Sequence, residues 1–213
     1  MTLPGTIPLF PLPNVVFFPR MPLPLHVFEP RYREMVRDAA RGARLIGMVL
    51  LRGDWQHDYY GHPPIFSVGT VGEMVRLEEL PDGRFNIVLR GLREFTIVRE
   101  LDRAAYREAT VTWRDKLVDG LPAGVRDAIR HLVRRYLELR GQEVGDQDVL
   151  HANVDDETMV NFLSQHLDVS PLDKQAMLEA TTLVERAGRL VDVLEFRLQE
   201  MSLPGATPSS RPH

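Results

Sequence analysis

Apolar and polar residues alternate along much of the first half of the chain, the pattern of strands with one buried face. The clearest alternation runs through residues 65–80 and 84–100, on either side of the sequence LPDGR at residues 80–84. Because proline, aspartate and glycine favour tight turns, these two runs predict a β-hairpin. A shorter alternating run at residues 106–113 predicts one more strand.

The opening segment, residues 7–36, combines apolar residues with seven prolines. Proline lacks an N–H group and has a fixed φ. The prolines before Pro30 therefore exclude a helix there and allow only short strands at a sheet edge or with a bulge. Pro30 itself suits the first turn of a short helix. We expect this helix to run to about Arg41 and to end at Gly42.

Residues 44–51 form an almost continuous apolar run that is too short for a surface helix. We therefore predict a central strand that is buried on both faces. The polar and aromatic residues 53–64 contain glycines and end in two prolines, which predicts an irregular loop. Together, the patterns of the first half predict seven or eight strands and one short helix, as in a small barrel-like sheet.

The pattern becomes helical after residues 114–120. Apolar residues three and four positions apart predict four amphipathic helices, the first over residues 125–139. The third helix has Ser170 as an N-cap before a proline, and the fourth pairs Thr182 with Glu185 in a capping box. Four helices joined by short links predict a compact bundle.

These patterns predict an α+β fold with two parts and a tail. Residues 1–116 would form a β-rich subdomain with a single short helix. Residues 117–201 would form the helical bundle subdomain. Residues 202–213 lack an apolar face and predict a disordered tail.

Composition narrows the class of protein further. The chain of 213 residues has no cysteine, which excludes a disulfide framework, a thiolate metal site and a cysteine nucleophile. The formal net charge is −4; residues 1–113 contain 14 basic and 13 acidic residues, and residues 114–213 contain 12 and 17. Neither part has the excess of positive charge that nucleic acid binding demands, so nucleic acid is a disfavoured partner.

Residues 1–19 carry no charged side chain, and such an uncharged start could indicate a targeting segment. They contain five prolines and no basic start, which argues against a signal peptide and against a membrane span. We therefore expect a cytoplasmic protein without a membrane partner.

The two lysines of the chain, Lys116 and Lys174, bear on two kinds of enzyme. Neither follows a glycine, so the chain has no P-loop for ATP, and we expect no cofactor. Ser-Lys catalysis would need a lysine beside a serine, and Lys174 lies one helical turn after Ser170. Because Ser170 already serves as the predicted helix cap, we expect no catalytic residues and no enzyme activity. A cryptic hydrolase ranks last among the hypotheses, since no nucleophile, base and orienting group are placed together.

Three aromatic residues of the predicted loop, Trp55, Tyr59 and Tyr60, are candidates for contact with a partner. Aromatic side chains on a loop give a large contact area at a low entropy cost. The alternative is that these rings only anchor the loop against the barrel.

Arg31 and Tyr32 are two further candidates. They follow Pro30 at a predicted helix start, where a carboxylate or a peptide terminus could bind. The alternative for the arginine is a salt bridge to Glu29, to Glu34 or to the sheet.

Three histidines raise the question of a metal or catalytic site. His57 and His62 flank Asp58, but two histidines five positions apart in an irregular loop specify no coordination geometry, and we expect solvated side chains and no metal. For His26, in a predicted strand, we expect a hydrogen bond to the backbone or an orientation toward solvent.

Several motifs together resemble the N-terminal substrate-binding domain of the ATP-dependent Lon protease. Two lie in the opening segment, IPLFPL at 7–12 and LPLHVFEPRY at 23–32. The others are VGTVG at 68–72, LPDGR at 80–84 and LRGLREF at 89–95. The resemblance covers nearly the whole chain, more loosely in its helical part. It implies a PUA-like β pseudo-barrel followed by a helical bundle.

The resemblance also implies a function. The chain is similar to a free-standing, short form of this domain, without the ATPase and Ser-Lys peptidase modules of full-length Lon. The resemblance implies a non-enzymatic module that recognises unfolded or extended polypeptide or that acts with a separate protease. The polypeptide would bind in a groove between barrel and bundle or at an exposed strand edge. The alternative is an RNA-binding protein, because PUA-like folds include RNA-binding members.

Overall fold

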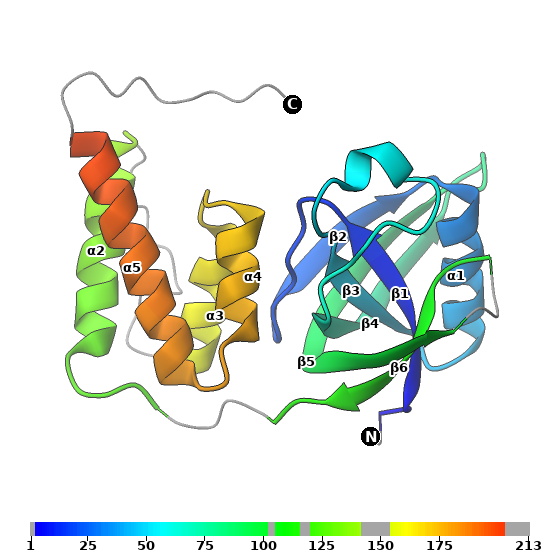
Figure 1. The fold of residues 1–213 in the computed structure, drawn as a ribbon, viewed down its shortest axis with the longest axis horizontal. Coiled ribbons are helices and arrows are strands. Elements are labelled where there is room, and N and C mark those ends of the chain that lie inside the picture. Colours follow the sequence, from blue (N-terminus) through cyan, green and yellow to red (C-terminus); the bar gives the residue numbers. More distant parts are fainter. Residues whose placement is uncertain (1–2, 102–104, 116–119, 142–153, 203–213) are drawn as a thin grey trace. The chain divides into compact units, whose positions relative to one another are not determined.

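The computed structural model confirms an α+β protein, and the residues that it describes form a mixed six-stranded sheet and five α-helices (Figure 1). The chain divides into two compact units, the first made of residues 1–116 and 165–179 and the second of residues 117–164 and 180–213. The residues that the structure describes are 3–101, 105–115, 120–141 and 154–202, so the predicted tail lies outside them from residue 203 onward.

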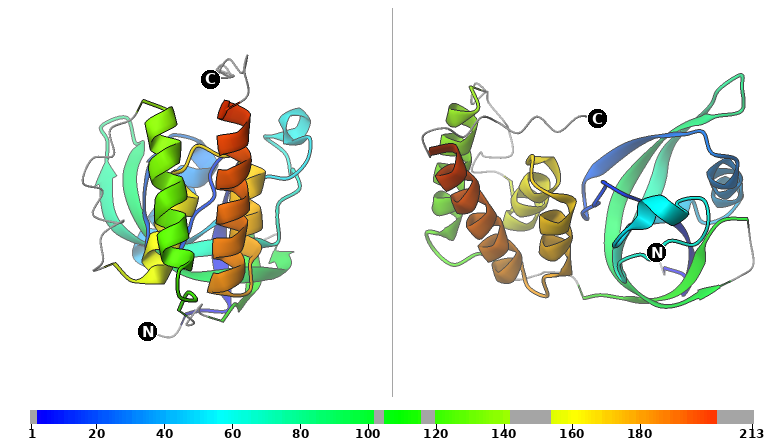
Figure 2. Two further views of the ribbon diagram at one scale, coloured as in Figure 1. Left: turned by 90° about the vertical axis from the view of Figure 1, so that its left-hand side faces the viewer. Right: turned by 45° about the horizontal axis from the view of Figure 1, so that its top comes forward.

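The first unit is built on the sheet. Its strands are β1 (Thr6–Leu12), β2 (Pro22–Val27), β3 (Leu45–Leu50), β4 (Val68–Glu79), β5 (Phe85–Leu101) and β6 (Glu108–Trp113). Their order is β2-β5-β4-β3-β1-β6, and β5 is long enough to pair with β6 as well. This second pairing closes the strands from β5 to β6 into a ring, which is seen from its end in the right-hand view of Figure 2.

The predicted hairpin and the predicted central strand are both confirmed. β4 and β5 form the antiparallel hairpin, and Gly83 in its turn has a φ of 77°, which favours glycine. β3 is buried along its whole length, parallel to β1 on one side and antiparallel to β4 on the other. The described residues hold six strands instead of the predicted seven or eight, because residues 13–21, which connect β1 to β2, form no strand of their own.

Apolar side chains from five strands fill the inside of the ring. A fully buried Val, Leu, Ile or Phe side chain contributes about 1.5–3 kcal/mol to the stability of a fold. The members of this cluster are Ile7, Leu9, Leu45, Val49, Val71, Phe95, Ala109 and Val111.

Helix α1 (Pro30–Arg41) confirms the predicted short helix, with Pro30 in its first turn and Gly42 as its C-cap. Its buried face includes Tyr32, Met35 and Val36. The Tyr32 ring packs on Phe10 of β1, with 4.3 Å between the ring centroids. The apolar face therefore fixes the start of α1 against the sheet.

The second unit contains α2 (Val125–Leu139), α5 (Leu183–Ser202) and all but the last two residues of α3 (Asp156–His166). Helices α2 and α5 lie side by side in both views (Figure 2). The N–H of Glu185 donates to Thr182 Oγ1 at 3.1 Å, as the predicted capping box requires, while the Glu185 carboxylate accepts from Thr181. No helix in the described part of the chain is long and apolar enough to cross a membrane.

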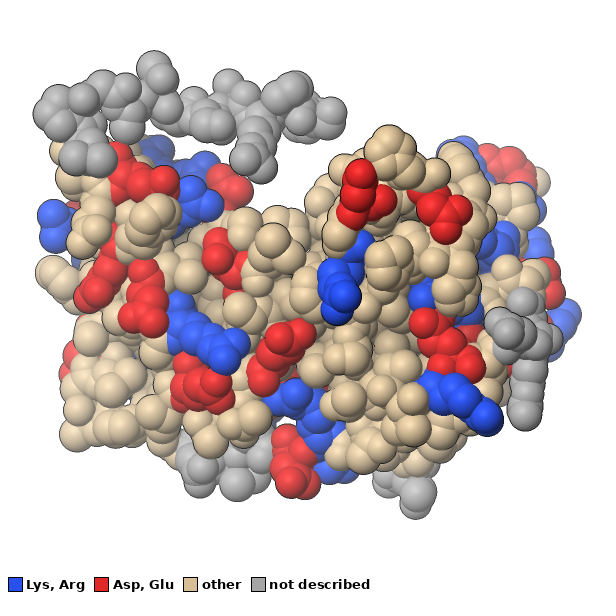
Figure 3. Space-filling view, in the orientation of Figure 1, with Lys and Arg blue, Asp and Glu red and all other residues tan. Residues whose placement is uncertain are grey.

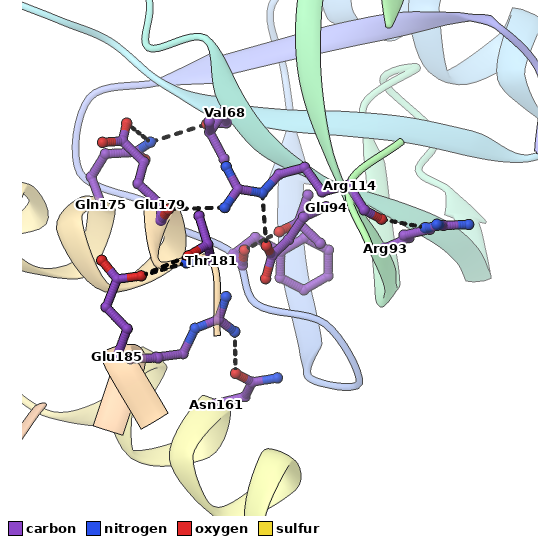
Figure 4. Close-up of polar contacts among 12 residues, drawn as sticks. Val68, Arg93, Glu94, Arg114, Asn161, Gln175, Glu179, Thr181 and Glu185 are labelled. Carbon is purple, nitrogen blue, oxygen red and sulfur yellow. Dashed lines mark hydrogen bonds and ion pairs between the residues drawn. The ribbon is translucent and has the colours of Figure 1, made fainter. Parts of the chain in front are cut away.

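Helix α4 (Pro171–Glu179) groups with the sheet and not with the other three helices. The amide of Gln175, which is buried, donates to the carbonyl oxygen of Val68 on β4 at 3.0 Å (Figure 4). Arg114, just after β6, donates to the carbonyl oxygen of Glu179 at 2.9 Å. These bonds join α4 to the sheet, so the grouping differs from the predicted division, in which residues 117–201 form one four-helix bundle.

Candidate functional site

All five predicted contact residues lie together in the first unit. Trp55 begins a short 3₁₀ helix, η1 (Trp55–Asp58), which lies across one end of the ring (Figure 2). Its ring centroid is 5.9 Å from that of Tyr59, which is 5.2 Å from that of Tyr60. The guanidinium of Arg31 lies over the Tyr32 ring at 4.7 Å and over the Tyr59 ring at 5.6 Å. Their role in binding stays a prediction.

Glu29 links the loop to the start of α1. Its carboxylate accepts hydrogen bonds from Arg31 Nε at 3.1 Å and from the Tyr59 hydroxyl at 2.8 Å. Arg31 also donates from Nη2 to the carbonyl oxygen of Tyr59 at 3.2 Å. We call these three residues the Glu29 network. Arg31 thus forms the salt bridge to Glu29 that was its structural alternative, and Tyr59 anchors the loop.

Tyr60 differs from Trp55 and Tyr59, which are half-buried, because it is 84% exposed. Its ring meets only the edge of Tyr59 among the aromatic contacts of the described residues. The Glu29 network holds the adjacent backbone in place. Tyr60 is therefore a large ring that is presented to solvent on an anchored loop.

Burial favours the neutral form of two tyrosines at this site. It raises the pKa of Tyr32 to about 12. Burial, with the hydrogen bond to Glu29, raises the pKa of Tyr59 to about 12 as well. Both hydroxyl groups are therefore protonated hydrogen-bond donors near neutral pH.

A pocket of about 190 Å³ lies beside this cluster. Its lining includes Arg31, Tyr32, Tyr60 and His62. Tyr106 and Arg107, which directly precede β6, also line it. Sequence reasoning missed Tyr106 and Arg107. They lie in a run that was interpreted only as a strand, and no local pattern pointed to their proximity to Arg31.

Three interactions hold the wall of this pocket that Tyr106 and Arg107 form. Arg107 donates from Nε and Nη2 to the two carboxylate oxygens of Glu100, both at 2.7 Å, and from Nη1 to the carbonyl oxygen of Pro63 at 2.7 Å. The Tyr106 hydroxyl donates to Asp38 Oδ2 at 3.0 Å. Burial is the main cause that raises the pKa of Tyr106. The wall is therefore held from α1, β5 and the loop together.

The structure places His57 and His62 against different carboxylates. His57 Nε2 lies 3.1 Å from Asp54 Oδ2, and His62 Nε2 lies 3.1 Å from Glu100 Oε2. Within the described ranges, no group of three or more His, Asp or Glu side chains could hold a metal ion. The histidines of the loop thus form separate polar contacts.

His26 is exposed and contacts two side chains of β5 and its turn. Its Nδ1 lies 2.8 Å from Asn86 Oδ1, and its Nε2 lies 3.2 Å from Arg84 Nη1. His26 thus points toward solvent, as one of the two expectations stated. Its partners are side chains, so the expected hydrogen bond to the backbone is not among these contacts.

Ser170 and Lys174 each have a structural partner. Ser170 Oγ donates to Asp173 Oδ2 at 2.7 Å and accepts from the N–H of Asp173 at 3.1 Å, as an N-cap does. Lys174 Nζ donates to the carbonyl oxygen of Gln165 at 2.6 Å. Burial lowers the pKa of Lys174. These hydrogen bonds give both side chains a structural role, Ser170 as the cap of α4 and Lys174 as a link from α4 to the end of α3.

The outer edge of β2 is poor in hydrogen-bond donors. In an antiparallel pair, alternate residues turn both backbone groups toward the same neighbour. The carbonyl oxygen of Pro22 accepts from Gln165 at 3.0 Å, so Pro22, Pro24 and His26 face away from β5. Two of these three residues are prolines without an N–H group. Such an edge does not favour the addition of a peptide strand.

Charge is mixed on the face that Figure 3 shows, where Lys and Arg side chains alternate with Asp and Glu. Ion pairs of the sheet unit include Arg31 with Glu29, Arg90 with Glu73, and Arg107 with Glu100. Phosphate binding relies on clustered, unneutralised positive charge. The RNA-binding alternative is therefore not favoured.

The fold is an α+β module whose curled sheet carries a pocket lined by aromatic and guanidinium groups at one end. The family model of the ATP-dependent protease La (LON) substrate-binding domain matches residues 6–195. The chain therefore belongs to this family of substrate-recognition modules, which is related to ATP-dependent proteases.

Similar proteins agree with this assignment. The chain is 27% identical to a Lon protease of Cytophaga hutchinsonii over 94% of its own length and 25% of that protein. It is 26% identical to Lon protease 2 of Myxococcus xanthus, over 98% and 26%. The chain thus spans about a quarter of the length of these curated relatives.

Two solved structures share the fold. One is a Lon N-terminal domain protein from Xanthomonas campestris, with a TM-score of 0.66 and 24% identity, covering 88% of this chain and 97% of that one. The other is the N-terminal domain of Lon protease from the Mycobacterium avium complex, with a TM-score of 0.70 and 16% identity, covering 89% and 98%.

Proposed function

We propose that this chain is a non-enzymatic recognition module that binds unfolded or extended polypeptide through the surface around Tyr60. The observation that carries the proposal is the 84% exposure of the Tyr60 side chain on a loop anchored by the Glu29 network. A large exposed ring on fixed backbone gives contact area at a low entropy cost, as the energetically dominant residues of protein interfaces do.

A separate protease is the second proposed partner. The curated relatives named above are Lon proteases, and the chain corresponds to about a quarter of each. A substrate-recognition module of this kind would hold a polypeptide that another protein then degrades.

The proposal is tested by measuring the binding of fluorescently labelled, reduced and alkylated α-lactalbumin by fluorescence anisotropy, without ATP. We expect saturable binding to this unfolded chain and none to the native, disulfide-bonded form. Tyr60→Ala should weaken binding by roughly tenfold, since it removes a central aromatic contact. Val98→Ala, on β5, is the matched control because Val98 is also exposed, at 63%.

The proposal fails if the wild-type protein binds no unfolded polypeptide at high micromolar concentration. Equal binding by the Tyr60 and Val98 variants would instead remove Tyr60 from the binding surface.

A further inference from the structure

Among the described residues, the lining of the pocket beside Tyr60 has positive charge and no carboxylate. Two guanidinium groups, of Arg31 and Arg107, contribute to its wall. Their side chains are 22% and 10% exposed. Because these groups are largely removed from water, a charged ligand there would be screened less than on an open surface.

The guanidinium groups are held in place by carboxylates that do not line the pocket. Glu29 binds Arg31 at Nε, and Glu100 binds Arg107 through two parallel hydrogen bonds. Each guanidinium carries more N–H donors than its contacts within the described residues use. The pocket therefore presents oriented donors at no further cost in side-chain ordering.

Local charge distinguishes between possible anions. The two arginines and the two glutamates sum to a formal charge of zero, so this site lacks the excess charge that stabilises a doubly charged phosphate. A single carboxylate is planar, carries one charge and matches the geometry of guanidinium donors. A pocket of about 190 Å³ also has room for a side chain that carries a carboxylate.

We propose that this pocket binds one carboxylate of the client polypeptide, from an Asp or Glu side chain or from its C-terminus, with Tyr60 covering the neighbouring residue. The inference rests on the proposed function and names the chemistry that the site selects. With this pocket, the module would recognise acidic groups that lie next to apolar residues, and not apolar sequence alone.

Three labelled, unstructured peptides of the same apolar sequence test the inference by fluorescence anisotropy on the full chain. The first has an internal Glu and a C-terminal amide, the second has Gln and the amide, and the third has Gln and a free C-terminal acid. We expect at least one peptide with a carboxylate to bind about tenfold more tightly than the uncharged one, as loss of a charge-assisted hydrogen bond implies. The pattern of gains identifies the source of the carboxylate.

Arg31→Gln should abolish this difference between peptides, whereas Arg90→Gln, which changes an exposed arginine of β5 outside the pocket lining, should keep it. Equal binding of all three peptides to the wild-type protein would overturn the inference and leave the proposed function standing. A tenfold gain that persists in Arg31→Gln would also overturn it. Absence of binding by every peptide would count against the proposed function itself.

Discussion

The packing around Gly69 leaves no room for a side chain. A Cβ at this position would lie 2.3 Å from the carbonyl oxygen of Met48 and 2.8 Å from the Phe95 ring. The first neighbour is backbone of the adjacent strand β3 and cannot move aside without breaking the ladder. The glycine therefore sets how closely β3 and β4 approach inside the ring.

Gly69→Ala should destabilise the protein by about 1–3 kcal/mol, because the added methyl group overpacks the ring. The matched control is Gly188→Ala. Gly188 is exposed within α5 and a Cβ there would meet nothing within 4 Å. Alanine favours helices over glycine, so this variant should be stabilised by about 1 kcal/mol.

Urea unfolding followed by circular dichroism measures both effects. An unchanged midpoint for Gly69→Ala would show that the strands can separate without cost, contrary to this account.

The hydrogen bonds of Gln175 define α4 as an element of the sheet unit. Its amide donates to the carbonyl oxygen of Val68 and to Glu179 Oε1, both at 3.0 Å. The sequence predicted the helix and its Ser170 cap, but helical periodicity does not say which neighbour covers an apolar face. That choice depends on residues more than a hundred positions away.

Gln175→Met should lower the free energy of unfolding by about 1–3 kcal/mol, because it leaves a buried carbonyl group without its donor while keeping the length of the side chain. Leu172→Ala, on the same helix, should have little effect since Leu172 is 64% exposed. Thermal and urea unfolding of the two variants provide the comparison. Equal stability of the two variants would argue against a bonding role for Gln175.

Tyrosine ionisation limits the stability of the whole molecule at alkaline pH. The pKa of Tyr32 and that of Tyr59 rise from about 10 in the unfolded chain to about 12 in the folded protein. Above pH 10 the unfolded chain therefore releases protons that the folded chain keeps. The free energy of unfolding is unaffected by these groups below pH 10 and falls as pH rises from about 10 to 12.

Tyr59→Phe should make this fall less steep, because the variant has one such tyrosine fewer. Urea unfolding between pH 9 and 12, together with tyrosinate absorbance of the folded protein, measures the effect. Full tyrosinate absorbance near pH 10 in the folded state would contradict the raised pKa values.

Much of the candidate site could be anticipated from residue type and local position. Arg31 and Tyr32 follow a helix-start proline, and Trp55, Tyr59 and Tyr60 lie in a predicted loop. Two further parts could not, for different reasons. The bridging role of Glu29 depends on a loop that folds back 30 positions along the chain. Arg107 reaches the pocket only because β6 pairs with β5 to close the ring.

Local pattern was sufficient for α1, the hairpin, the buried strand β3 and the helix caps, because each depends on residues a few positions apart. Family membership also lies in the motifs of the linear sequence. The sequence predicted a barrel-like sheet, but the strand order that closes the ring, the docking of α4 and the pocket between Arg31 and Arg107 come from tertiary structure alone. These features depend on contacts between distant segments, whose free energies are set by packing and by hydrogen-bond geometry and leave no periodic pattern in the sequence.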